Sequence, residues 1–175
     1  TMLEPLGFNN TFAILVRGAE ARRLGLHTIS DAVPHTRGWR AAFGYEFLER
    51  ADGYTGLARA YGLQFAGAPR IMDLSLTYRA LAGGQVDLIA GDATAGLIAA
   101  LDLTMLEDDR RYFPPYDAVP VVHAATLLRE PRIRTALHRL AGRVRETDMR
   151  AMNYAVEGGK QDPAAVVRRF LDRLE

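Results

Sequence analysis

The sequence contains no cysteine, which excludes disulfide bonds, thiolate metal sites and cysteine nucleophiles. Lysine is nearly missing too: Lys160 is the only one, and no Gly-Lys-Ser/Thr triplet is present for a phosphate-binding loop. The two serines, Ser30 and Ser75, stand outside any Gly-x-Ser-x-Gly segment, and the four histidines show no metal-ligand spacing. Most enzymes that carry a local signature are therefore disfavoured, and no residue pattern indicates a cofactor or a metal.

The sequence also has neither an excess of one charge sign nor a long apolar run. The 22 basic and 21 acidic residues give a net charge of +1, whereas a nucleic-acid binder usually has a clear basic excess. No apolar stretch approaches the roughly 18 residues of a membrane span, and the first five residues lack the features of a signal peptide. With 175 residues, 49% of them apolar, the chain suits one domain or two small lobes.

Short apolar runs alternate with helical segments up to about residue 107. We expect strands at 12–16, 39–44, 70–72, 86–90 and 103–106, and helices at 19–24, 31–35, 54–61, 74–82 and 95–101. Gly25 and Gly62 are placed to end two of these helices, and Asp73 is placed to cap the helix that begins at 74. The alternation predicts an α/β fold with a mainly parallel sheet covered by helices.

The pattern changes at residues 112–116, where two adjacent prolines interrupt both helix and strand. Beyond them we expect one strand at 119–123 and three helices at 131–141, 146–156 and 163–174. A single strand does not make a stable sheet, so this part of the chain needs strands from elsewhere.

Four residues near the expected strand ends can carry ligand chemistry. Sheets of this kind bind ligands beyond the carboxyl ends of their strands, and the loops around the sheet supply Phe12, Arg50, Asp92 and Tyr116. Aromatic faces and a nearby carboxylate hold a quaternary ammonium, which has no hydrogen to donate, and a guanidinium holds a carboxylate. The set suits a small zwitterion and contains no pair of base and nucleophile.

Each of these residues also has a purely structural interpretation. Arg50 stands two residues before Asp52, and the two can form an ordinary ion pair. Tyr116 can pack on the neighbouring prolines, Asp92 can cap a helix, and Phe12 can belong to the core. The residues alone leave these alternatives open.

Several longer motifs occur in the same order in one known family. Among them are Gly7-Phe8-Asn9-Asn10-Thr11-Phe12-Ala13, Glu46-Phe47-Leu48-Glu49-Arg50-Ala51-Asp52-Gly53-Tyr54 and Phe113-Pro114-Pro115-Tyr116. Through these motifs the chain resembles the substrate-binding proteins of bacterial ABC importers for glycine betaine, choline and related osmoprotectants. The likeness runs from about residue 3 to the C-terminal helices, so it is more specific than any single short pattern.

The resemblance implies a periplasmic-binding-protein type II fold, with the ligand in a cleft between two lobes. Residues 11–106 resemble the complete second lobe, and residues 112–175 resemble the C-terminal segment of the first lobe, with one strand and helices. The N-terminal part of that first lobe is missing from the sequence, which would leave the strand expected at 119–123 without its partners.

The resemblance also implies a site. Arg50 matches the arginine of the family's Glu-Phe-x-x-Arg-x-Asp-Gly segment, Tyr116 matches a tyrosine of its ammonium cage, and Phe12 replaces another tyrosine while keeping the ring. Asp92 stands where many relatives have an aromatic residue, and it can pair directly with a cation that lacks a carboxylate. The ligand-binding residues expected from the resemblance are Asn10, Thr11, Phe12, Arg50, Asp92, Thr94 and Tyr116.

The implied function is that of a solute-binding component of an ABC importer for quaternary-amine osmoprotectants, with no enzymatic activity and no cofactor. Its partners would be the small quaternary-amine ligand and an ABC permease, with no nucleic acid, at the periplasmic or extracellular face of a bacterial membrane. We also expect a homodimer or a second polypeptide that completes the first lobe. The alternatives are a small-molecule-sensing effector domain of the same fold and an enzyme grown from it, although the candidate loops hold no histidine or lysine.

Overall fold

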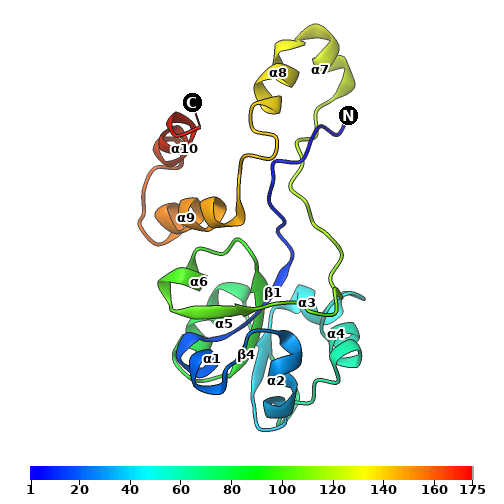
Figure 1. Ribbon diagram of the computed structural model, residues 1–175, viewed down its shortest axis with the longest axis vertical. Helices are drawn as coiled ribbons and strands as arrows, with labels where there is room; N and C mark the ends of the chain where they lie inside the picture. Colours follow the sequence, from blue (N-terminus) through cyan, green and yellow to red (C-terminus); the bar gives the residue numbers. More distant parts are fainter. Residues whose placement is uncertain (175) are drawn as a thin grey trace.

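The computed structural model describes residues 1–174 (Figure 1). Its five strands are β1 Phe12–Arg17, β2 Ala41–Phe43, β3 Arg70–Ile71, β4 Leu88–Asp92 and β5 Leu103–Leu106. The helices among and after them are α1 Gly18–Leu24, α2 Ile29–Thr36, α3 Tyr45–Glu49, α4 Tyr54–Tyr61, α5 Leu74–Ala82, α6 Leu97–Ala100, α7 Ala124–Arg129, α8 Arg132–His138, α9 Glu146–Glu157 and α10 Pro163–Asp172. We call residues 12–113 the sheet lobe and residues 1–11 with 114–174 the outer segments. Among the described residues, none of the helices has the length and apolar character needed to cross a membrane.

The strands form one sheet in the order β3-β2-β4-β1-β5. β2 is parallel to β3 and β4, but β1 runs antiparallel to both β4 and β5. Four of the five described strands therefore run in the same direction, so the expectation of a mainly parallel sheet is confirmed, and β1 is the one strand that runs the other way. Strand β1 enters the sheet at the end where β4 finishes, so that Phe12 stands opposite Asp92.

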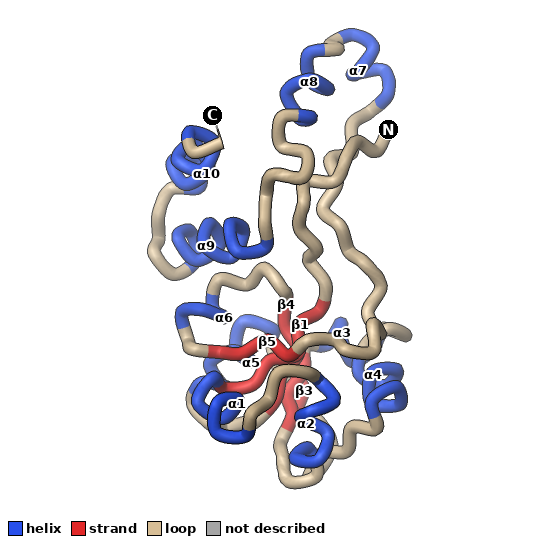
Figure 2. Tube along the Cα trace, in the orientation of Figure 1, coloured by secondary structure: helices blue, strands red, loops and turns tan. Residues whose placement is uncertain are grey.

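Helices cover both faces of this sheet, because successive side chains of each strand point to opposite faces. Along β1, Ile14 and Val16 join the core cluster under α1 to α4, whereas Ala13 and Leu15 join the cluster under α5 and α6. Gly62, in the left-handed conformation, ends α4 as expected. The result is a three-layer lobe, seen in the lower half of Figure 2 with its strands in red.

Most expected elements of the sheet lobe are present. The strand at 103–106 and the helices at 54–61 and 74–82 match the structure, and Asp73 caps α5 by accepting a hydrogen bond from the backbone N–H of Ser75 at 2.9 Å. The strand expected at 86–90 is shifted to β4, two residues later. The short helices α3 and α7 were not expected from the sequence.

The outer segments are built differently. Residues 1–10 and 116–122 are extended and antiparallel, joined by backbone hydrogen bonds such as Leu3 N–H to the Pro120 carbonyl at 3.0 Å. The strand expected at 119–123 is reduced to one isolated bridge between Met2 and Val121. Figure 1 shows these two stretches rising from the sheet lobe toward α7 and α8, while α9 lies beside α6.

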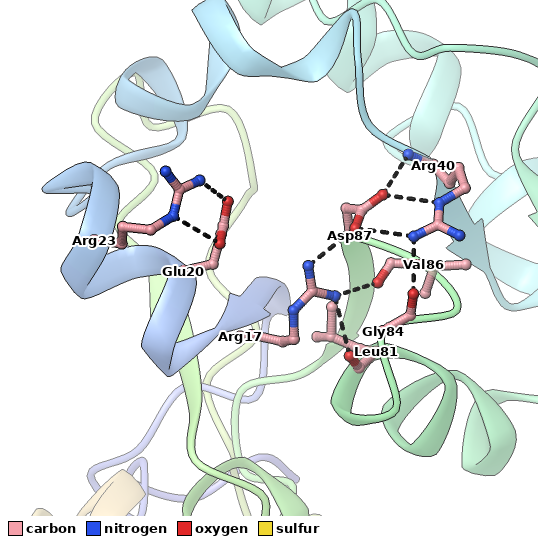
Figure 3. A network of polar contacts seen from close by, with 8 residues as sticks. All are labelled: Arg17, Glu20, Arg23, Arg40, Leu81, Gly84, Val86 and Asp87. Atoms are coloured by element: carbon pink, nitrogen blue, oxygen red, sulfur yellow. Dashed lines mark hydrogen bonds and ion pairs between the residues drawn. The ribbon is translucent and has the colours of Figure 1, made fainter.

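One end of the sheet is fixed by a partly buried aspartate (Figure 3). Asp87, just before β4, accepts hydrogen bonds from Arg17 Nη2 at 2.9 Å and Arg40 Nε at 3.0 Å. Burial alone would raise the pKa of Asp87, but the bonds from Arg40 and Arg17 hold it at about 2. Because Arg17 ends β1 and Arg40 precedes β2, the cluster joins three strands at the end opposite the Phe12–Asp92 pair.

Candidate ligand site

A small pocket of about 160 Å³ lies at the end of the sheet where β1 begins and β4 finishes. Its walls come from the sheet lobe and from both outer segments: Asn10, Phe12, Glu46, Arg50, Asp92 and Tyr116. Five of these are residues that the sequence singled out, and Glu46 is new. The pocket therefore gathers residues more than 100 positions apart in the chain.

Arg50 is held by acidic neighbours. It follows α3 directly, and its Nε and Nη2 atoms donate to the two carboxylate oxygens of Asp52 at 2.8 and 2.9 Å. Its Nη1 atom lies 3.4 Å from Glu46 Oε1. The hydrogen bonds to Arg50 lower the pKa of Asp52, and the same contact raises the pKa of Arg50. The positive charge of Arg50 is thus largely balanced before any ligand is present.

Tyr116 joins this cluster from the outer segment that follows the two prolines. Its hydroxyl donates to Asp52 Oδ2 and accepts from Arg50 Nη2, and its backbone N–H donates to Asn9 Oδ1 at 2.8 Å. The Arg50 guanidinium lies 5.7 Å from the centre of the Tyr116 ring. Tyr116 therefore does more than pack on the prolines, because it ties the outer segments to the arginine.

Phe12 supplies an aromatic face between the core and the pocket. Its ring lies 4.9 Å from that of Phe47 in an edge-on arrangement and 6.4 Å from that of Tyr116. The Arg50 guanidinium is 5.6 Å from the Phe12 ring centre. The residue is half-buried, so one side packs on the core cluster while another faces the cavity.

Asp92 ends β4 and lines the pocket. Within residues 1–174, its side-chain carboxylate has no hydrogen-bond donor, although its backbone N–H donates to the Tyr78 hydroxyl at 2.9 Å. The helix-cap interpretation is wrong, because α6 begins at Leu97 behind Gly96. Burial raises the pKa of Asp92, and the nearby charges of Glu46 and Glu157 raise it further.

The sequence around this pocket matches a known family over nearly the whole chain. The profile for the substrate-binding domain of ABC-type glycine betaine transport systems matches residues 1–173. The chain belongs to this family. Its members are transport proteins rather than a class of enzymes.

Two curated relatives agree with this assignment. The carnitine transport binding protein OpuCC of Listeria monocytogenes is 32% identical over 174 residues, which cover 99% of this chain and 56% of the relative. The glycine-betaine-binding protein of Pseudomonas aeruginosa is 33% identical over 97% of this chain and 58% of its own length. The chain thus spans little more than half the length of these relatives.

A solved structure gives the same fold. The crystal structure of a glycine betaine/carnitine/choline ABC transporter aligns with a TM-score of 0.90 and 35% identity, over 99% of this chain and 63% of that one. The fold is therefore that of the type II periplasmic binding proteins, as the resemblance implied.

The remaining expected residues, Asn10, Thr11 and Thr94, stabilise the backbone around the pocket. Asn10 Oδ1 accepts hydrogen bonds from Thr94 Oγ1 at 2.6 Å and from the Thr94 backbone N–H at 3.3 Å. The Thr11 carbonyl accepts from Ala93 N–H at 3.0 Å, and its buried hydroxyl has no hydrogen-bond partner within residues 1–174. Asn10 lines the pocket, whereas Thr11 and Thr94 are outside its wall. These contacts hold the loop after Asp92 against the start of β1.

Sequence reasoning missed Glu46 as part of the pocket wall. A signal was present, because Glu46 and Arg50 are four residues apart, the spacing at which opposite charges meet on a helix. It was overlooked because α3 itself was not expected. The ion pair of Arg50 with Asp52 was one of the alternatives that the sequence left open, and the structure shows it as a bidentate bond made from the extended conformation of Arg50 at the end of α3.

Proposed function

We propose that this chain is the ligand-binding part of an ABC importer for quaternary-amine osmoprotectants, and that it holds its ligand in a cleft between the sheet lobe and the outer segments. Membership of the family supports the transport role. The pocket lined by Phe12, Tyr116 and Asp92 supports the ligand class, since aromatic faces with a carboxylate suit a quaternary ammonium.

The charge balance of the pocket favours a cation without a carboxylate of its own. Arg50, which would receive a ligand carboxylate, already donates to Asp52 and lies close to Glu46. Asp92 has no such partner within the described residues and faces the same cavity. A ligand cation would relieve the unpaired carboxylate, whereas a ligand carboxylate would meet two acidic walls. We therefore assign choline, or a close relative of it, as the preferred ligand over glycine betaine.

The seven residues take different roles in this proposal. Phe12, Arg50, Asp92, Tyr116 and Asn10 contact the ligand, because they line the pocket. The other two, Thr11 and Thr94, position the loop beside Asp92 through their bonds to Ala93 and Asn10.

The same reasoning extends to the domains and partners. We take 11–106 as the complete second lobe and 112–175 as the C-terminal segment of the first, and we place the protein at the periplasmic or extracellular face of the membrane. Ligand contact with both parts would close the cleft and present a surface to the ABC permease.

A second polypeptide, either a copy of this chain or one that completes the first lobe, would cover the outer segments. What supports this is a hollow of about 660 Å³ between residues 2–5 and α8, together with the exposed side chains of Met2, Val121 and Leu128. Light scattering of the purified chain tests this proposal. A dimer, or a complex with an added first-lobe polypeptide, agrees with it. A monomer that does not bind that polypeptide contradicts it.

Isothermal titration with choline, glycine betaine and carnitine tests the ligand assignment. We expect choline to bind with a dissociation constant of roughly micromolar, about 8 kcal/mol, and the two carboxylate-bearing ligands at least about tenfold more weakly. Asp92→Asn should weaken choline about tenfold, whereas Asp102→Asn, whose carboxylate pairs with Arg22 at the surface, should leave it unchanged. Equal or tighter binding of glycine betaine by the native chain would contradict the assignment, and no binding of any of the three would contradict the proposed function.

A further inference from the structure

A second, larger pocket adjoins the first. It has a volume of about 390 Å³ and lies across the carboxyl ends of β2, β3 and β4, between the first residues of α3 and α5. The two pockets share Phe12, Glu46 and Asp92 on their walls. Phe12 and Asp92 face each other across the β1–β4 pairing, so the two cavities form neighbouring compartments of one site.

The smaller compartment is small for a ligand pocket. Pockets for small molecules usually measure about 300–1,000 Å³. The compartment with Arg50 and Tyr116, at about 160 Å³, falls below this range, whereas the larger one lies within it. A ligand confined to the smaller compartment would leave the larger one unused beside it.

The wall of the larger compartment is mainly apolar. Tyr45, Ile71 and Leu74 lie on it with much of their side chains exposed, and Met72 and Phe47 complete the apolar surface. Exposed large apolar side chains gathered at one cavity indicate a surface that is covered when the cavity is occupied. An apolar wall of this kind suits the hydrocarbon part of a ligand.

The charged residues of the larger compartment are all acidic. They are Glu46, Asp73 and Asp92. Asp73 is engaged as the cap of α5, where its Oδ1 accepts from the Ser75 backbone N–H at 2.9 Å and from the Ser75 hydroxyl at 2.6 Å. Glu46 and Asp92 stand at the boundary with the first compartment. No basic side chain of the described residues lines this cavity, so it offers a ligand carboxylate no partner.

We propose that the ligand is an ammonium with an uncharged hydrocarbon arm, its cationic head beside Asp92 and its arm in the larger compartment. The inference rests on the proposed function for the position of the head group. The arm is a separate claim, carried by the second cavity, its shared wall and its apolar lining. Each methylene that the arm buries should strengthen binding about fourfold.

Three trimethylammonium compounds test the arm by isothermal titration of the full chain. They are choline, hexyltrimethylammonium, and the compound of equal chain length that ends in a carboxylate, 6-(trimethylammonio)hexanoate. We expect the hexyl compound to bind at least about tenfold more tightly than choline. The carboxylate-ended compound should lose that advantage, because its terminal charge would enter a cavity with acidic and apolar walls.

Two variants test the location. Leu74→Ser removes an apolar wall, and Gly44→Val fills part of the cavity. Gly44 tolerates a side chain, since its φ is −66° and an added Cβ would meet Leu74 at an ordinary 3.8 Å. Either change should bring the affinities for hexyltrimethylammonium and choline to within about twofold of each other. Leu76→Ser is the matched control, because Leu76 is exposed on the same helix but lies outside the cavity, and it should preserve the tenfold difference.

The outcomes separate the two proposals. Binding of choline without any gain for the hexyl compound would overturn the arm and leave the proposed function standing. A gain that persists in both Leu74→Ser and Gly44→Val would overturn the location, provided that urea unfolding shows both variants folded. If none of the three compounds binds, both proposals fail together. A gain lost in both variants and kept in Leu76→Ser supports the inference.

Discussion

The sheet lobe and the outer segments are held together in different ways. Among residues 1–174, all but four of the buried hydrophobic side chains lie in the sheet lobe, and the exceptions are Leu127, Val144, Val166 and Phe170. Both hydrophobic core clusters belong to the sheet lobe alone. The outer segments instead rely on backbone hydrogen bonds between extended stretches and on the contact of α9 with α6. Burial of apolar surface dominates folding free energy, so the sheet lobe should carry most of the stability of this chain.

The proposed ligand site lies where the two regions meet. Its charged groups belong to the sheet lobe, whereas Asn10 and Tyr116 come from the outer segments. In the proposed function, the sheet lobe would supply the charges that recognise the ligand, and the outer segments would move to enclose it.

The largest expected effect contrasts two leucines. Leu57 is fully buried in α4, and Leu57→Ala should lower the free energy of unfolding by about 2–5 kcal/mol. Leu128 in α7 is 83% exposed, and Leu128→Ala should change it by less than about 0.5 kcal/mol. Urea denaturation followed by circular dichroism measures both. A similar loss of unfolding free energy in the two variants would contradict the idea that the sheet lobe carries most of the stability.

A smaller effect is expected at Asp87. Asp87→Asn leaves Arg17 and Arg40 without their partner and should cost roughly 2 kcal/mol at pH 7, less than a fully buried pair because Arg40 is half-exposed. The folded pKa of about 2 lies below the usual value of about 3.9, so this stability is complete above pH 4 and is lost as the pH falls through 2. Urea midpoints across that range measure it.

The control for this prediction comes from the outer segments. Glu4→Gln removes the surface pair between Glu4 and His138, both of which are well exposed. It should leave the urea midpoint unchanged, since exposed pairs add little. If Glu4→Gln and Asp87→Asn shift the midpoint equally, ion pairs would contribute alike to both regions.

The smallest effect concerns the boundary between the regions. Because burial, Glu46 and Glu157 raise the pKa of Asp92, this group should gain a proton at a higher pH than an ordinary aspartate does, and choline affinity should drop several-fold as the pH falls. Glu157→Gln in α9 removes one of the negative charges, so the drop should move to lower pH. Titrations at a series of pH values measure the shift. An identical profile in the variant would mean that α9 does not act on the site.

The sequence predicted elements where local signals were strong. β5 and α5 matched because an apolar run with clear ends and a capped helix between Asp73 and Gly83 leave little freedom. The direction of β1 could not be predicted, since its apolar run looks the same whether its neighbours are parallel or antiparallel. The run at 119–123 failed as a strand because Pro120 has no N–H for a ladder and its partner stretch at 1–10 is itself isolated.

The site residues, like the helices and strands, were predicted where the sequence carried a clear signal. Motifs placed Phe12, Arg50 and Tyr116 together through family resemblance, and the structure brings them to one pocket. The larger compartment could not be predicted from the sequence, because its walls come from the ends of three strands and two helices with no shared motif. Its existence depends on strand order, which the sequence left open.

The points at which the chain enters and leaves the sheet lobe lie side by side, and this has a practical consequence. The chain enters the lobe beside the point where it leaves, because the backbone N–H of Asn10 donates to the Tyr116 carbonyl at 3.0 Å. Segments whose ends touch can be spliced into a surface loop of another protein without stretching the host. Residues 10–116 can therefore be inserted into a loop of a fluorescent protein, in which ligand binding at the pocket would change the fluorescence.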